Sequence, residues 1–312
     1  MTDPAQCFLG RYSRRRLLHV STAAAGALSL AALTTGPAWA ASSARLPADV
    51  ASRPANTLAS ILTPYRLVTY YGNPYTAAMG ILGALSKPQL VSALQSRANL
   101  YANLGNKPVR PTIHMVVTTA QAGPGSDGLY RARMPASLIG EYSNLAAANN
   151  MLFIADVQVG RSTVQAEVGA IESFLRQPQA HLALDPEFDM WGSQVPGVEI
   201  GHMTAAEINW ALGFLGQIAR STGQRKILIV HQFAANMLPD KANIGSDPNV
   251  DLAIVMDGWG GQPVKIEHYD VYVANSAIPY RGMKLFFEWD VNLMTPSQVL
   301  GLKPSPDVMI YQ

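Results

Sequence analysis

Eight short apolar runs recur along this chain, and stretches with helical periodicity separate most of them. Most of the runs are continuously apolar rather than alternating, which is typical of parallel strands covered on both faces. Strands that alternate with helices indicate βαβ units and a parallel sheet. The predicted strands are 67–71, 112–117, 152–157, 181–184, 227–231, 252–256, 283–287 and 308–311.

The stretches between these runs carry the marks of helices. Thr204 and Glu207 have the spacing of a capping box, and Thr295 is the predicted cap of the helix that begins at Pro296. The predicted helices are 85–104, 135–149, 162–176, 204–221 and 296–300.

Eight such units predict a single (β/α)8 barrel of the TIM type over residues 57–312. The last run ends beside the C-terminus, so the final helix is missing, and we expect a helical segment at 56–62 to cover the gap. An open doubly wound sheet is the alternative. It would need a glycine-rich fingerprint after the first strand, which Tyr71-Gly72-Asn73-Pro74 does not supply.

The N-terminus has the pattern of a twin-arginine signal peptide over residues 1–40. Ser13-Arg14-Arg15-Arg16 precedes a weakly apolar stretch of small residues, and Ala38-Trp39-Ala40 resembles a cleavage site. We therefore expect export by the Tat translocase to the periplasm or beyond, with no stable membrane anchor. Residues 41–56, rich in Ala, Ser and Pro, are expected to form a flexible N-terminal segment.

Composition narrows the class of protein. The hydrophobic share of 48% and charged share of 14% are those of a globular protein. Cys7 is the sole cysteine, which excludes a disulfide framework and a cysteine-based zinc site. The formal net charge is +2, and loss of the arginine-rich signal would bring it close to zero. We therefore expect no nucleic-acid partner.

The active site of such a barrel lies at the carboxyl ends of its strands. Acidic and aromatic side chains gather after the predicted strands, although only 21 of 312 residues are acidic. For any single residue, capping of a loop is an equally good interpretation. The residues expected to bind substrate are Tyr71, Asp156, Gln158, Arg161, His231, Gln232, Trp259 and Tyr311.

Asp185-Pro186-Glu187, after the fourth strand, is the sharpest candidate for chemistry. On an extended chain the two acids point to the same side, and each carboxylate raises the pKa of the other. Glu187 would then be the general acid/base and Asp185 would tune it. Glu288 after the seventh strand would be the nucleophile, or Asp257 the second carboxylate. The alternative for this motif is a calcium-binding or loop-capping turn.

Other interpretations stay open. Arg161 could bind an anion at a helix start or pair with Asp156 or Asp185 as a structural tie. No cofactor is expected for the leading hypothesis, but an oxygen-rich site for Mg²⁺, Mn²⁺ or Ca²⁺ is the alternative. Its ligands would be Asp156, Asp185, Glu187, His231 and Asp257.

The chain resembles an uncharacterised family of secreted bacterial (β/α)8-barrel proteins. The phrases that carry this likeness are 71–74, 156–162, 181–187, 230–233 and 256–258. More distantly it is similar to family 18 chitinases and family 25 muramidases, which place an Asp-x-Glu at the end of strand four with the Glu as catalytic acid. Asp185-Pro186-Glu187 matches that motif, but the longer chitinase run of acids is missing, and Tyr70-Tyr71 stands where muramidases carry Asp.

Three hypotheses follow. The leading one is a secreted hydrolase of glycosidic bonds in an extracellular or cell-wall polysaccharide. The second is a metal-dependent hydrolase, for example of phosphodiesters, that uses the same acids. The third is a non-catalytic barrel that binds carbohydrate or cell wall.

Overall fold

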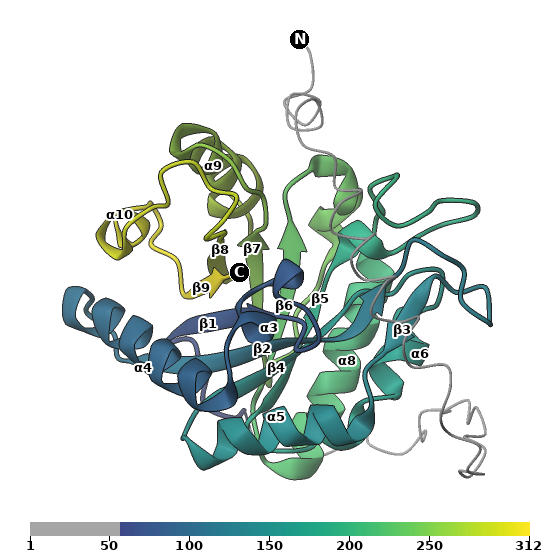
Figure 1. Cartoon of the computed structure of the whole chain (residues 1–312), viewed down its shortest axis with the longest axis horizontal. Helices are drawn as coiled ribbons and strands as arrows, with labels where there is room; N and C mark the ends of the chain where they lie inside the picture. The colour runs from purple at the N-terminus through teal and green to yellow at the C-terminus, as the bar shows by residue number, and fades with distance from the viewer. Residues whose placement is uncertain (1–56) are drawn as a thin grey trace.

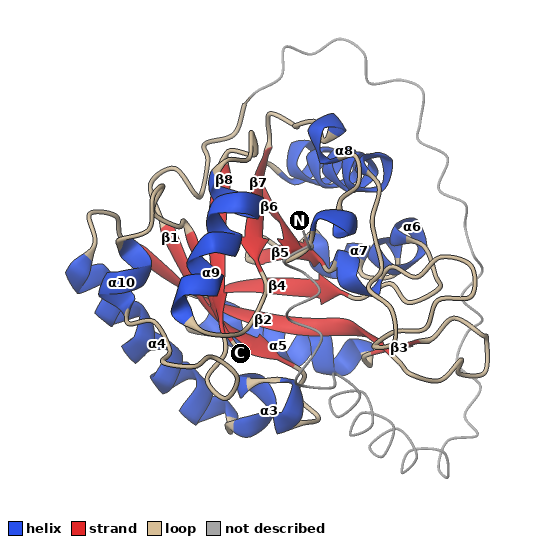
Figure 2. Ribbon diagram, turned by 90° about the horizontal axis from the view of Figure 1, so that it is seen from above, coloured by secondary structure: helices blue, strands red, loops and turns tan. Residues whose placement is uncertain are grey.

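Eight parallel strands close into a barrel surrounded by helices (Figure 1, Figure 2). The computed structural model describes residues 57–312, so the predicted signal peptide and the segment 41–56 lie outside the described residues. Each strand pairs in parallel with the next, and β1 pairs with both β2 and β9, which closes the ring. The strands are β1 (Arg66–Gly72), β2 (Val109–Ala120), β4 (Leu152–Val157), β5 (Ala180–Leu184), β6 (Lys226–Gln232), β7 (Val250–Met256), β8 (Tyr280–Leu285) and β9 (Val308–Tyr311).

This ring confirms the predicted (β/α)8 barrel and excludes the open sheet. All eight predicted runs are strands, and 152–157 and 308–311 coincide with β4 and β9. The largest displacement is at β8, which ends at Leu285 rather than at Phe287. The N–H of Phe286 instead donates to Oδ2 of Asp290 at 3.0 Å, which turns the chain out of the sheet.

Most predicted helices are present and lie outside the barrel. They are α4 (Lys87–Leu104), α5 (Ala136–Ala148), α8 (Ala205–Thr222) and α10 (Pro296–Leu300). The capping box of α8 forms as predicted, with Oε2 of Glu207 accepting from the N–H of Thr204 at 2.8 Å. The predicted helix 162–176 is instead two short helices, α6 (Val164–Gly169) and α7 (Glu172–Leu175), because the chain leaves helical geometry at Ile171.

Several elements were not predicted. β3 (Arg131–Arg133) pairs antiparallel with the end of β2, and α3 (Ile81–Ala84) follows the turn after β1. The crossing from β7 to β8 contains α9 (Gln262–Tyr269), which continues into the π-helical turn η5 (Asp270–Ala274). Short 3-10 turns fill other loops: η1 (Ala77–Met79), η2 (Pro186–Phe188), η3 (Ala235–Met237) and η4 (Lys241–Asn243).

The predicted helix at 56–62 is wrong within the described residues, since residues 57–60 are irregular and 62–64 form a turn. The backbone N–H groups of this segment donate to the carboxylate of Asp251 instead of to the backbone carbonyls of a helix. Its Oδ2 accepts from the N–H groups of Ile61 at 2.7 Å and Leu62 at 3.0 Å. The side chain of Leu62 is fully buried with the barrel interior, so this segment closes the end of the barrel opposite the carboxyl ends of the strands.

Two apolar clusters fill the protein. The larger lies between the barrel and its helices, and the smaller fills the barrel interior with residues such as Leu67, Ile154 and Ile310. Toward the carboxyl ends of the strands the buried interior becomes polar, and this change marks the candidate site. Among the helices of residues 57–312, none combines the length and the apolarity that crossing a bilayer requires.

Candidate active site

A pocket opens at the carboxyl ends of the strands, as expected for this fold. Its polar lining consists of Gln158, Asp185, Glu187, Asp257, Lys284 and Gln312. Its aromatic lining consists of Tyr71, Phe188, Trp259, Phe286 and Trp289. On one wall the Trp259 ring lies 6.1 Å from that of Trp289 and 6.0 Å from that of Phe286, centroid to centroid. The pocket therefore combines three carboxyl groups with a wall of aromatic rings.

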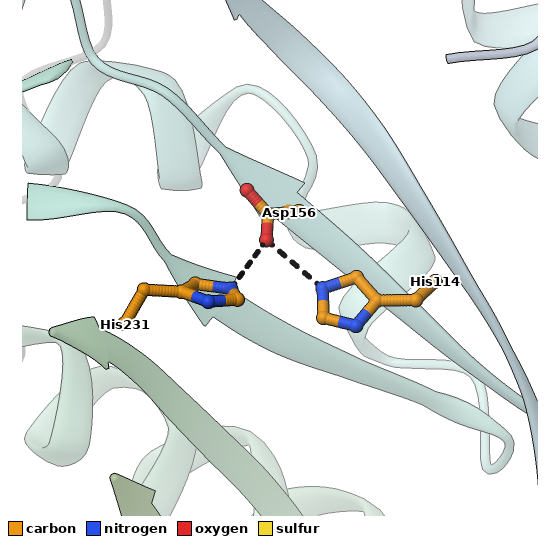
Figure 3. A group of neighbouring side chains, drawn as sticks. All are labelled: His114, Asp156 and His231. Atoms are coloured by element: carbon orange, nitrogen blue, oxygen red, sulfur yellow. Dashed lines mark hydrogen bonds and ion pairs between the residues drawn. The ribbon is translucent and has the colours of Figure 1, made fainter. Parts of the chain in front are cut away.

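A fully buried group of side chains lies deeper in the barrel (Figure 3). Asp156 on β4 stands between His114 on β2 and His231 on β6. Its Oδ2 atom lies 2.9 Å from Nε2 of each imidazole. None of these three residues lines the pocket, so Asp156 and His231, which were predicted to bind substrate, lie beneath it.

The polar chain continues from this group to the pocket. Nδ1 of His231 lies 3.2 Å from Oδ2 of Asp257, and the same oxygen accepts from Nζ of Lys284 at 3.0 Å. Nζ of Lys284 also lies 3.8 Å from the ring centre of Tyr71. Asp257 and Lys284 therefore form the floor of the pocket, with the deeper histidines beneath them.

His114 and His231 differ in their electrostatics. Burial lowers the pKa of His114 to about 4, despite its contact with Asp156. Burial also disfavours charge on His231, but its contacts with Asp156 and Asp257 outweigh burial and raise its pKa to about 10. Those histidine contacts, together with Lys284 beside Asp257, hold the pKa values of the two carboxyls below their usual range against the effect of burial.

Asp185 is the carboxyl that differs from its neighbours. It is 2% exposed, Nε2 of Gln158 donates to its Oδ2 at 3.5 Å, and its Oδ1 has no hydrogen-bond partner. Burial raises its pKa to about 7, and the charges of Asp257 and Asp156 act in the same direction. A carboxyl group of this kind is protonated in part of the population near neutral pH.

Glu187 is half-buried and lines the same pocket as Asp185. The extended geometry predicted for this pair is wrong, because residues 186–188 form η2 and the N–H of Phe188 donates to the carbonyl of Asp185 at 3.1 Å. Pro186 favours this turn because its φ is already close to the helical value. The two acids nevertheless share one pocket, as the motif predicted.

Other predicted site residues lie elsewhere. Glu288 is exposed in the turn after β8 and is not part of the pocket lining. Tyr311 points out of the barrel toward α4, where its hydroxyl lies 2.7 Å from that of Tyr101. Gln232 is held by its own loop, since it donates to the carbonyl of Ala234 at 3.1 Å.

Arg161 pairs with neither Asp156 nor Asp185, so the structural tie that was predicted as one alternative does not form. Its guanidinium donates to the carbonyls of Gln194 at 2.8 Å and Ser193 at 2.6 Å, and it lies 4.1 Å from the ring centre of Tyr130. Arg161 therefore anchors the loop that contains Ser193 and Gln194, next to the pocket.

Sequence reasoning did not commit to His114, Lys284, Phe286 or Gln312 as site residues. A signal was present for two of them. His114 and Lys284 are the ionisable residues inside the predicted strands 112–117 and 283–287, which are otherwise largely apolar. A polar group there must face either the helices or the barrel interior, and a buried cation needs a buried carboxylate.

The metal-binding capacity of the site also differs from the prediction. Among the described residues, the group whose ligand atoms converge is His114, Asp156 and His231, with these atoms all within 4.8 Å of one another. Asp156 and His231 belong to the predicted donor set. Asp185, Glu187 and Asp257 do not join this group.

No family model and no curated protein matches this chain. Among solved structures it is similar to 2,3-dimethylmalate lyase, a PEP mutase/isocitrate lyase superfamily member, with 10% identity, a TM-score of 0.46, and coverage of 80% of this chain and 76% of that one. It is also similar to oxaloacetate acetylhydrolase, with 13% identity, a TM-score of 0.44, and coverage of 79% and 75%. A third is a provisionally assigned alpha-L-fucosidase from Bacteroides thetaiotaomicron, with 9% identity, a TM-score of 0.38, and coverage of 86% and 90%.

These likenesses are too distant to bear on chemistry. The barrel itself is established by the strand pairing described above. The resemblance to family 18 chitinases and family 25 muramidases gains no support from these structures.

Proposed function

We propose that this chain hydrolyses glycosidic bonds in a polysaccharide, with Asp185 as the proton donor and Asp257 as the second carboxylate. The observation that carries the proposal is the pocket lining, in which three carboxyl groups face the same space as Trp259, Trp289 and Phe286. Aromatic faces suit the apolar C–H faces of sugar rings, and paired carboxyls supply the acid and the base or nucleophile of glycoside hydrolysis.

The roles follow from the surroundings of each carboxyl. Asp185 has a buried oxygen without a partner, which is free to donate a proton to a leaving group. Its pKa of about 7 supports this role. Asp257 is paired with Lys284 at 3.0 Å, which favours its ionised form. Glu187, half-buried in the same lining, would position the sugar or the attacking water.

The charge of the pocket favours a neutral substrate over a phosphodiester. Lys284 is the one basic side chain among the lining residues, and Asp257 pairs with it. A phosphate would meet three carboxyl groups with no free cation beside them. A polymeric sugar substrate also accords with export, which the twin-arginine pattern of residues 1–40 predicts.

The test is release of reducing ends from soluble peptidoglycan fragments, chitin oligosaccharides, xylan and β-glucan. We expect one of these classes to be cleaved and Asp185→Asn to lower kcat by about 10²–10⁴-fold. Asp270→Asn is the matched control, because Asp270 is exposed on η5 and outside the pocket lining. Turnover that survives Asp185→Asn would refute the assignment of the acid. Tight glycan binding without turnover by the wild type would point to a binding protein.

A further inference from the structure

The buried group His114, Asp156 and His231 has no part in the proposed hydrolysis. It lies beneath the pocket and contributes no lining residue. Its three members come from β2, β4 and β6, so three separate strands direct polar side chains to one point in the barrel interior (Figure 3). Burial of polar groups is costly unless they are satisfied.

The separation of the donor atoms is that of neighbouring ligands on one ion. Oδ2 of Asp156 lies 2.9 Å from Nε2 of His114 and 2.9 Å from Nε2 of His231. Bonds of about 2.1 Å that meet at right angles place neighbouring ligand atoms about 3 Å apart. Tetrahedral bonds of the same length would place them about 3.4 Å apart. The observed spacing of 2.9 Å, which is also a hydrogen-bond distance, is closer to the six-coordinate value than to the tetrahedral one.

Hydrogen bonds alone leave this group incompletely satisfied. Both imidazoles are directed at Oδ2 of Asp156, while Oδ1 of the same carboxylate is buried and has no hydrogen-bond partner. An ionised oxygen in this position loses its hydration without compensation. A carboxylate that contacts an ion with both oxygens would use Oδ1 as well.

The far side of His231 provides a separate observation. Its Nδ1 lies 3.2 Å from Oδ2 of Asp257, an ion-pair contact without hydrogen-bond geometry, so a carboxylate stands behind the ring nitrogen that does not face Asp156. Histidines that bind metals commonly donate their other ring N–H to a carboxylate, which fixes the ring and its tautomer.

We propose that His114, Asp156 and His231 bind one six-coordinate divalent ion of the first transition series, Mn²⁺ or Fe²⁺. Two imidazoles and one carboxylate are the donor set that suits such ions, whereas Mg²⁺ and Ca²⁺ prefer oxygen ligands alone. This site differs from the all-acid site that the sequence suggested. It shares Asp257 with the proposed hydrolysis, but binding of the ion needs no substrate. Asp257 is a positioning residue for it, because it acts through His231.

Metal stoichiometry tests the proposal without any substrate. The chain would be purified, stripped with a chelator, reloaded with Mn²⁺ in air or Fe²⁺ without oxygen, and measured by elemental analysis. We expect one ion per chain, a Mn²⁺ electron paramagnetic resonance signal of bound metal, and a Tm higher by roughly 5–10 °C at a hundredfold excess over Kd. Failure of the wild type to retain either ion would overturn the site.

Variants locate the ion. Asp156→Asn should abolish retention, and Asp257→Asn should weaken it by roughly 10–100-fold through loss of the contact behind His231. Asp270→Asn should bind as the wild type does. If Asp156→Asn retains the ion as well as the wild type does, the assignment of the ligands is wrong. If the protein retains Zn²⁺ but neither Mn²⁺ nor Fe²⁺, the proposed six-coordinate geometry is wrong. If Asp156→Asn does not fold, His114→Gln replaces it, and the wild-type measurement stands by itself.

Discussion

Lys284 and Asp257 form an ion pair at the floor of the pocket, with Nζ and Oδ2 separated by 3.0 Å. Lys284 is 3% exposed and Asp257 is 6% exposed, so water screens the pair weakly. The pair also joins two ends of adjacent strands, since Lys284 lies on β8 and Asp257 directly follows β7. Each side chain of the pair therefore neutralises the charge of the other and fixes its position.

Lys284→Met should destabilise the fold by about 3 kcal/mol, because it removes the lysine that pairs with the buried Asp257. Urea unfolding at pH 7 measures the change. Lys303→Met is the matched control, since Lys303 is exposed, and it should change stability by less than about 0.5 kcal/mol. Equal stability of Lys284→Met and the control would show that the pair has no net effect.

The proposed acid predicts a pH profile. The pKa of Asp185 is about 7, so its protonated form is lost as the pH rises through that value. We expect kcat/KM to fall about tenfold per pH unit on the alkaline side, with a midpoint near 7. The groups that act on this pKa are Asp156, His231, Asp257 and Lys284. A profile that stays flat from pH 6 to 9 would rule out Asp185 as the acid.

Asp189 predicts a second pH effect, on stability. Burial and the charge of Glu207 raise its pKa to about 8, above the value of about 3.9 in an unfolded chain. The folded state therefore binds more protons between these values, and this contribution to stability is lost as the pH rises toward 8. Asp189→Asn should make the protein more stable at pH 8 by more than about 1 kcal/mol.

Unfolding midpoints of wild type and Asp189→Asn at pH 5 and pH 8 measure this difference. The gain from the substitution should be larger at pH 8 than at pH 5. Asp270→Asn serves as control, because it makes the same substitution at an exposed position. A gain that is the same at both pH values would contradict the assignment to Asp189.

The hydroxyl pair Tyr101–Tyr311 predicts a purely structural effect. Both side chains are buried between α4 and β9, and their oxygens lie 2.7 Å apart. Tyr311→Phe should lower the free energy of unfolding by about 1 kcal/mol, and Tyr101→Phe by a similar amount. The double variant should cost less than the sum of the two, because each single change leaves the partner hydroxyl unpaired. Additive losses would show that the two hydroxyls do not interact.

The barrel could be predicted from the sequence because its strands are apolar on both faces and stand out from the helices between them. Because the strands are continuously apolar, their sequence does not show which side chains point into the barrel and which point outward. Ile310 packs inside the barrel and Tyr311 packs outside it, and a continuously apolar run gives no sign of this alternation. For this reason the sequence did not indicate that the side chain of Tyr311 lies outside the barrel beside Tyr101.

Part of the site could also be predicted. Asp185, Glu187 and Asp257 follow strands directly, and the barrel brings them to one pocket. Glu288 does not arrive there because Asp290 turns the chain two residues earlier than predicted. The interior group of His114 and Asp156 depends on contacts between strands far apart in sequence, which local patterns do not encode.

The segment of residues 57–64 lies at the end of the barrel opposite the pocket. The N–H of Leu58 donates to Oδ1 of Asn249 at 2.8 Å, just before β7 begins, while the pocket lies where β7 ends. A solid support or fusion partner joined to the protein at Thr57 would therefore be attached at the end of the barrel opposite the pocket. Large, insoluble polymers could then approach the open mouth without meeting the point of attachment.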